Sequence, residues 1–196
     1  MAIFHFQANV IQRSKGRSAV AAAAYRAGIE LMDERTGLSF DYSKKCGIGE
    51  TFIIGWSGSR SELWNAAEAA EKRKDSTTVR EYVVALPKEL DPMDRQALAR
   101  QLAELINDRY GVVVDVCLHG VDSVNPHAHL LTTTREMCPV YQELGRKSIV
   151  DISNADRKKR KDHKKKRLLG TARDELEWLK KDWCNIVNSV YLRSQQ

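Results

Sequence analysis

Apolar residues recur at helical spacing in several segments of the chain. In one of them Leu98, Leu102 and Leu105 follow one another every three or four positions. In another, Ser18 precedes a run of alanines that ends at Gly28, and these two residues are typical N-cap and C-cap signals. We therefore predict helices over residues 19–27, 61–74, 91–110 and 171–192.

Other segments are short and rich in β-branched residues, which predicts strands. Residues 112–119 and 127–134 are joined by a connector that contains Gly120 and Asn125-Pro126 and is short enough for an antiparallel hairpin. The other expected strands are residues 1–10, 51–54 and 79–86.

The stretches between these elements carry less signal. Residues 30–55 are expected to be irregular apart from that one strand, and residues 138–170 lack clear periodicity. A chain of 196 residues and 22.3 kDa suits one domain with a single sizeable core. We predict an α+β fold: a mostly antiparallel central sheet with helices packed on one face and the active site on the other.

Positive charge is concentrated in one segment. The net charge is +6, and residues 157–167 hold nine Lys or Arg against one Asp, so the rest of the chain carries about −2. This distribution favours a phosphate-binding loop, although such a run is also typical of a solvated linker or a localisation tract. The first 29 residues add four basic residues and no acidic ones. The candidate phosphate-binding side chains are Arg13, Lys15, Arg17, Arg26, Arg157, Lys158, Lys159, Arg160, Lys161, Lys164, Lys165, Lys166 and Arg167.

Composition excludes several classes of protein. No apolar run approaches the ~20 residues that span a bilayer, so we expect no membrane insertion. The first ten residues alternate like a strand and do not resemble a signal peptide, which favours a cytoplasmic protein. The four cysteines form no C-x-x-C pair, so we expect reduced thiols and no zinc knuckle.

Three of the five histidines fall on the predicted hairpin. His127 and His129 are two residues apart on one strand, so both side chains project from the same face of the sheet. Closing the hairpin brings His119 across from His127. Three neutral imidazoles that converge in this way are typical of an open metal site. The H-x-H pair on its own is equally compatible with two partly exposed sheet histidines.

Glu81 is the one carboxylate in the predicted strand over residues 79–86. It can accept the second N–H of a metal-bound histidine, or take the proton of a nearby tyrosine. A solvated glutamate at the end of a strand is an alternative that the sequence leaves open. Asp115 shares strand parity with His119 and is a weaker candidate for the same supporting role.

Tyr25 lies on the alanine-rich helix. The positions three, four and seven residues before it are Ala22, Ala21 and Ser18, so no bulky neighbour covers its ring. A lone tyrosine most often belongs to the core or the surface. Next to a phosphate-binding metal and basic loops, however, it becomes a candidate nucleophile.

These residues also carry a family resemblance. R-S-A-V-A-A-A-A-Y-R (residues 17–26), R-E-Y-V-V-A-L-P (80–87) and N-P-H-A-H-L-L (125–131) resemble, in order and spacing, the relaxase domain of MobA/MobL plasmid mobilisation proteins. The resemblance covers essentially the whole chain, 1–196, and implies an HUH endonuclease. It matches Tyr25 to the nucleophile, His119, His127 and His129 to the metal ligands, and Glu81 to an acidic residue near the site.

The resemblance implies a DNA nicking and joining enzyme that forms a 5′-phosphotyrosyl intermediate at a plasmid transfer origin. It implies a divalent cofactor, Mg²⁺ or Mn²⁺, with Zn²⁺, Co²⁺ or Ni²⁺ also compatible with nitrogen ligands. The expected partners are single-stranded DNA with an adjacent hairpin or duplex, accessory relaxosome proteins and a coupling protein. Family members often continue into helicase, primase or membrane-associated regions. The sequence therefore leaves open whether the chain is a minimal relaxase or a fragment of a longer protein.

Two other functions fit the same residues. A rolling-circle replication initiator uses the same chemistry at a replication origin. A non-catalytic DNA-binding adaptor would carry the three histidines incidentally. Specificity for a transfer origin over a replication origin distinguishes a relaxase from the replication initiator. Formation of a covalent protein–DNA adduct distinguishes an enzyme from the non-catalytic adaptor.

Overall fold

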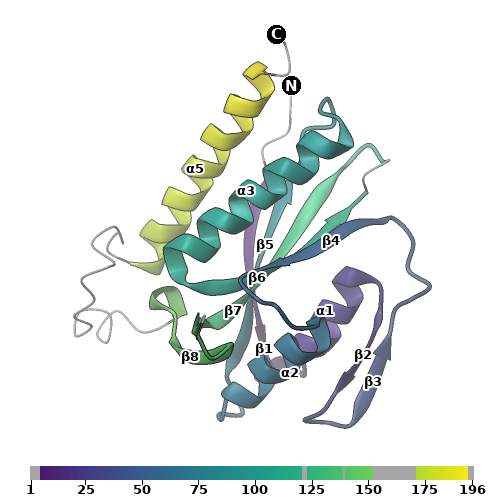
Figure 1. Ribbon diagram of the computed structural model, residues 1–196, viewed down its shortest axis with the longest axis vertical. Helices are drawn as coiled ribbons and strands as arrows, with labels where there is room; N and C mark the ends of the chain where they lie inside the picture. The colour runs from purple at the N-terminus through teal and green to yellow at the C-terminus, as the bar shows by residue number, and fades with distance from the viewer. Residues whose placement is uncertain (1–4, 121–122, 139, 152–170, 194–196) are drawn as a thin grey trace.

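A computed structural model describes residues 5–120, 123–138, 140–151 and 171–193 of the chain. Its centre is an antiparallel sheet in the order β1-β5-β7-β6-β4, with β8 paired to the far end of β7 (Figure 1). The predicted hairpin is confirmed, because β6 and β7 pair directly. The strands are β1 (Phe6–Gln12), β4 (Ile48–Ile54), β5 (Thr77–Ala85), β6 (Val112–His119), β7 (His127–Cys138) and β8 (Glu143–Lys147).

Four helices are described, and each predicted segment contains one. Ser18 and Asp91 cap α1 and α3 through their side chains, and Ser59 forms a capping box with Glu62 at the start of α2. Gly28 ends α1 at a φ of 63°, a left-handed conformation that disfavours a side chain. The helices are α1 (Ala19–Ala27), α2 (Arg60–Ala70), α3 (Pro92–Tyr110) and α5 (Ala172–Arg193).

Two of the expectations for weakly patterned segments were wrong. Residues 30–55 contain a separate hairpin of β2 (Glu30–Asp33) and β3 (Leu38–Asp41), and β4 begins at Ile48. Residues 138–151 contain β8 and a short 3-10 helix, η2 (Ile149–Asp151). β2, β3 and β8 are only four or five residues long, so their periodicity is too short to detect.

The α+β class and the antiparallel sheet are confirmed, but helices cover both faces of the sheet. Helices α3 and α5 pack on the face that carries Val114 and Leu130, whereas α1 and α2 pack on the face that carries Val113 and Leu131 (Figure 1). The expectation of helices on one face only is therefore corrected. The reason is visible in β6, where all eight residues are buried, so both faces of that strand need a covering layer.

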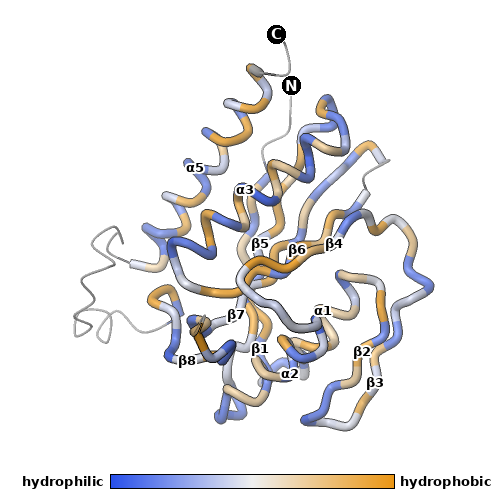
Figure 2. The backbone as a smooth tube through the Cα atoms, viewed as in Figure 1, coloured by the Kyte–Doolittle hydropathy of each residue, from blue (hydrophilic) through white to orange (hydrophobic). Residues whose placement is uncertain are grey.

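Hydrophobic residues concentrate where the strands cross at the centre of the molecule, and α5 alternates between hydrophobic and hydrophilic positions along its length (Figure 2). Among the described helices, none is long and apolar enough to cross a membrane. The last turn of α1 lies next to the predicted histidine cluster, because the Arg26 carbonyl is 2.6 Å from His119 Nε2.

Candidate active site

The structure brings the three predicted histidines together. His119 on β6 lies directly opposite His127 on β7, and His129 is two residues further along β7. Their ring centroids are 4.6–5.5 Å apart, and one nitrogen from each ring lies within 4.8 Å of the others. All three point to the face covered by α1 and α2, whereas Ala128 and Leu130 point to the opposite core. The register predicted from the sequence is confirmed.

Each imidazole has one nitrogen engaged by an oxygen acceptor. His129 donates through Nδ1 to Glu81 Oε1 at 2.8 Å, and His127 donates through Nδ1 to the Asn125 carbonyl at 2.9 Å. His119 donates through Nε2 to the Arg26 carbonyl at 2.6 Å. In a neutral imidazole the other nitrogen then carries a free lone pair. The three rings are therefore oriented as metal ligands usually are, by oxygen atoms behind them.

The local electrostatics favour neutral rings. Burial, together with the charges of His129 and Lys45, lowers the pKa of His119 to about 4, although the hydrogen bond to the Arg26 carbonyl opposes this. Burial also lowers the pKa of His129, although the hydrogen bond to Glu81 opposes this. Neutral imidazole is the form that binds a divalent ion, so these two residues fit a metal site near neutral pH.

Glu81 links the histidines to α1. Only 3% of Glu81 is exposed, and its carboxylate accepts from Arg26 Nε at 2.9 Å and from an Arg26 terminal nitrogen at 3.2 Å, as well as from His129. Burial raises the pKa of Glu81, but the hydrogen bonds from His129 and Arg26 outweigh it and bring the pKa to about 2. Glu81 is therefore a charged bridge, and the alternative of a solvated glutamate is excluded.

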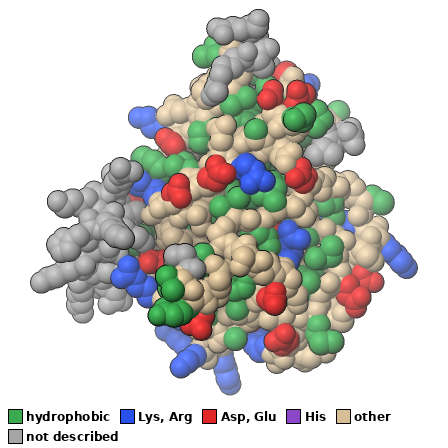
Figure 3. Space-filling view, in the orientation of Figure 1, with side chains coloured by type: hydrophobic (Ala, Val, Ile, Leu, Met, Phe, Trp, Pro, Cys, Tyr) green, Lys and Arg blue, Asp and Glu red, His purple; other side chains and the backbone are tan. Residues whose placement is uncertain are grey.

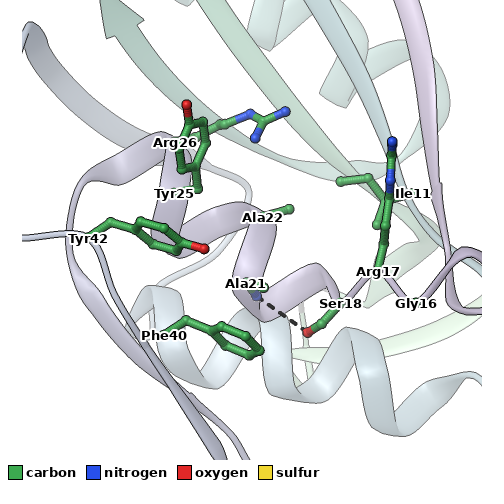
Figure 4. A pocket seen from close by; sticks show the side chains of 10 residues that line it. All are labelled: Ile11, Gly16, Arg17, Ser18, Ala21, Ala22, Tyr25, Arg26, Phe40 and Tyr42. Carbon is green, nitrogen blue, oxygen red and sulfur yellow. Dashed lines mark hydrogen bonds between the residues drawn. The ribbon is translucent and has the colours of Figure 1, made fainter. Parts of the chain in front are cut away.

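Tyr25 precedes Arg26 on α1 and is 44% exposed. Its side chain lies beside Arg26 at one end of a cavity whose walls include Ala21 and Ala22, as the helical spacing predicted (Figure 4). The ring of Tyr42 meets that of Tyr25 edge-on at a centroid distance of 5.1 Å. No large side chain on α1 covers the phenol, so an external group can reach it.

Lys45 is a site residue that the sequence did not reveal. Its ammonium lies 3.7 Å from the centroid of the Tyr25 ring and donates to the Tyr25 carbonyl at 2.8 Å. Burial, together with the charge of Arg26, lowers the pKa of Lys45. Lys45 follows the β2–β3 hairpin, which was predicted as irregular chain. Two four-residue runs separated by a turn that ends in Gly37 were the available signal.

The predicted basic residues take different positions. Arg26 is held by Glu81, and Arg13 is held by the Glu68 carboxylate and by carbonyls of Glu68 and Glu71 at the end of α2. Both therefore make internal contacts instead of presenting free charges. Lys15 and Arg17 are exposed. Residues 157–167 lie outside the described part of the chain.

Asp115 does not support the histidines. Its carboxylate accepts from two nitrogens of Arg60 and from Trp64 Nε1, each at 2.8 Å. It therefore anchors α2 on the sheet.

The face of the molecule in Figure 3 mixes acidic and basic side chains, and none of the described histidines shows on it.

The fold and the site together define a class of protein: an antiparallel α+β sheet with three convergent imidazoles at one end and an exposed tyrosine on the helix beside them. The MobA/MobL family matches residues 17–196 of the chain. The chain belongs to the MobA/MobL family, and the resemblance seen in its motifs is confirmed.

Named relatives agree with this membership. The chain is 50% identical over 127 residues to mobilization protein MobL of Acidithiobacillus ferridurans, a match that covers 63% of the chain and 34% of MobL. It is 37% identical over 153 residues to conjugal transfer protein TraA of Rhizobium radiobacter, covering 70% of the chain and 14% of TraA. The chain therefore spans about a third of MobL and about a seventh of TraA.

A solved structure shares the fold over nearly the whole chain. It comes from work on the molecular basis of vancomycin resistance transfer in Staphylococcus aureus. The two structures align with a TM-score of 0.80 at 30% identity, covering 98% of this chain and 94% of the other.

Proposed function

We propose that this chain is a relaxase domain that nicks and rejoins one DNA strand at a plasmid transfer origin. The observation that carries the proposal is the connection between the histidine cluster and Tyr25. Arg26 follows Tyr25 directly, binds Glu81 through its side chain and accepts from His119 through its carbonyl. A tyrosine on a helix turn that contacts a cluster of three imidazoles suits attack on a phosphodiester.

In this proposal, the Tyr25 oxygen forms a bond to phosphorus while the bond from phosphorus to the 3′ oxygen breaks. The phenolic proton passes to solvent, and the leaving oxygen takes up a proton to give a 3′-hydroxyl. One phosphodiester replaces another, so the same step in reverse can rejoin the strand. Attack needs an unpaired, accessible phosphate, so the substrate is single-stranded DNA at the nick, with an adjacent hairpin or duplex.

The residues fit a divalent ion such as Mg²⁺ or Mn²⁺, which His119, His127 and His129 would hold. A bound ion would neutralise charge on the non-bridging oxygens of the phosphate. Glu81 keeps His129 in the tautomer that has its free lone pair on Nε2. The Lys45 ammonium beside the Tyr25 ring adds positive charge where the anionic strand must approach.

Incubation with labelled single-stranded oligonucleotides and Mg²⁺ or Mn²⁺ tests the proposal. We expect a denaturant-resistant shift that chelator abolishes and added metal restores. Replacing His119, His127 or His129 singly by Ala should lower metal affinity and the yield of this adduct, with melting curves as a check on folding. A wild-type yield of adduct from all three variants in the presence of chelator would contradict the metal site. No adduct with any metal, despite DNA binding, would favour a non-catalytic adaptor.

The origin that is cut distinguishes the proposal from the initiator alternative. Transfer-origin oligonucleotides should form the adduct more efficiently than replication-origin oligonucleotides of the same plasmid. The opposite preference would assign the chain to rolling-circle replication.

A further inference from the structure

An open groove runs from Tyr25 around the start of α1 to the loop between α2 and β5. It consists of two adjoining cavities of about 390 and 420 Å³. The first cavity reaches Tyr25, and the second reaches residues 72–74. The residues that line both cavities are Gly16, Arg17, Ser18 and Phe40. Because the cavities share these walls, we treat them as one depression, the α1 groove.

The α1 groove carries positive charge that the protein itself does not neutralise. Lys72 and Lys74 line its far end and Arg17 its middle, all three are exposed, and none forms an ion pair within the described part of the chain. The four other basic lining residues are held by carboxylates: Arg13, Arg26, Arg35 and Arg73. Three free cations in sequence along one depression suit a ligand with several negative charges.

The acidic residue that lines the groove does not offset this charge at the surface. Asp33 is fully buried, and it accepts hydrogen bonds from Ser18 Oγ and from the backbone of Arg35. At the start of α1, the Ala19 N–H donates to the Glu68 carboxylate and the Ala21 N–H donates to Ser18 Oγ. We therefore assign the phosphate contacts in the groove to the exposed basic side chains.

The part of the groove next to Tyr25 has flat apolar walls. Phe40 and Tyr42 lie along one side, and Arg17 lies across from them (Figure 4). Between them α1 presents only the small side chains of Ala21 and Ala22. Aromatic rings beside basic side chains are typical of sites for single-stranded nucleic acid, where bases stack and cations contact the backbone.

We propose that the α1 groove binds the single-stranded nucleotides adjacent to the phosphate that Tyr25 attacks. Bases stack on Phe40 and Tyr42, and Arg17, Lys72 and Lys74 contact successive phosphates. The inference rests on the proposed function for the identity of the reacting strand. Binding in the groove itself requires neither metal nor cleavage, so it can be measured separately.

The charge contacts are tested with fluorescein-labelled oligothymidylate, by anisotropy from 50 to 200 mM salt without added metal. The double variant Lys72→Gln/Lys74→Gln should bind more weakly and flatten the slope of log K against log salt by about 1.4, or 0.7 per lost phosphate contact. The matched control Arg173→Gln/Lys181→Gln removes the same charge from exposed positions on α5. Equal slopes for the two double variants would overturn the proposal.

The stacking contact is tested with Phe40→Leu, which retains apolar volume in the wall but removes the aromatic face. It should weaken oligothymidylate binding at least fivefold, the lower end for one base stack, with an unchanged salt slope. Wild-type affinity in Phe40→Leu with an unchanged melting temperature would overturn the stacking assignment. The protein could also bind oligothymidylate through the groove and form no adduct with any oligonucleotide. That result would contradict the proposed function but support the groove as a binding site for single-stranded DNA.

Discussion

Replacing Glu81 with Gln tests the bridge between α1 and the histidine cluster. The substitution conserves size but removes the charge that three donors share: Arg26 through two nitrogens and His129 through one. Glu81 Oε1 accepts from both Arg26 Nε and His129 Nδ1, so a glutamine oxygen in that position can keep both bonds, but its NH₂ then faces the Arg26 terminal nitrogen that donates to Oε2. The bond from the Arg26 terminal nitrogen is lost and two donors face each other, and a neutral amide oxygen orients the His129 ring less strongly than a carboxylate does.

The structure sets the expected magnitudes. Hydrogen bonds to charged groups contribute about 1.5–3 kcal/mol each, and disrupting a buried ion pair costs about 3–5 kcal/mol. We therefore expect Glu81→Gln to lower the free energy of unfolding by about 3 kcal/mol, or roughly 6–12 °C in melting temperature for a chain of this size. Loss of an outer hydrogen bond to a metal-bound histidine lowers metal affinity about 10–100-fold.

Glu71→Gln provides a matched control. Glu71 is also buried and is held by Arg135 and Lys147, but it contacts none of the three histidines. Calorimetric titration with Mn²⁺ should show weakened binding in Glu81→Gln and wild-type binding in Glu71→Gln, while both variants melt at lower temperature. Mn²⁺ affinity within twofold of wild type in Glu81→Gln would refute the assigned role of Glu81.

Three further outcomes follow from charge and backbone geometry. Burial raises the pKa of Glu71, but Lys147 and Arg135 outweigh this effect and lower the pKa overall. The ion pairs of Glu71 therefore stabilise the fold at pH values above the ordinary Glu pKa and lose this effect as the pH falls. In urea unfolding, the difference in unfolding free energy between wild type and Glu71→Gln should be larger at pH 7 than at pH 3. Gly28→Ala should cost at least about 1 kcal/mol in the same assay, because φ is positive there and the new Cβ would collide with Ile48; wild-type stability would contradict this. Replacing the six lysines of residues 157–167 with Gln should flatten the slope of log K against log salt for DNA binding by roughly two to three. Discrimination between cognate and scrambled strands should stay unchanged, because phosphate contacts carry no base information. An unchanged slope would show that this segment does not contact the DNA.

The sequence predicts the site better than it predicts the surroundings of the site. The spacing of His127 and His129 is a direct consequence of strand geometry, and a short hairpin fixes His119 opposite them, so the cluster follows from local rules. The pairing of Arg26 with Glu81 joins residues 55 positions apart. No local pattern encodes that contact, so the sequence predicted that Arg26 is available to bind phosphate and left a solvated Glu81 open as an alternative.

The second helical layer was missed for a related reason. The apolar residues of β6 occupy both faces, which signals burial on both sides, but the sequence does not say which helices provide each layer. The β2–β3 hairpin was missed because strands of four residues are too short to show a period. That hairpin supplies Phe40, and the chain just after it supplies Tyr42 and Lys45, so the miss also hid one wall of the groove beside Tyr25.

The most direct test of the central claim is to locate the covalent bond by mass spectrometry. After reaction with a transfer-origin strand and Mn²⁺, nuclease trimming and trypsin digestion leave Tyr25 in the peptide of residues 18–26 and Tyr42 in the peptide of residues 36–44. We predict a phosphonucleotide mass on the first peptide in the wild type, and no adduct at all in Tyr25→Phe, which should still bind DNA. A modified 36–44 peptide, or an undiminished adduct in Tyr25→Phe, would contradict the account.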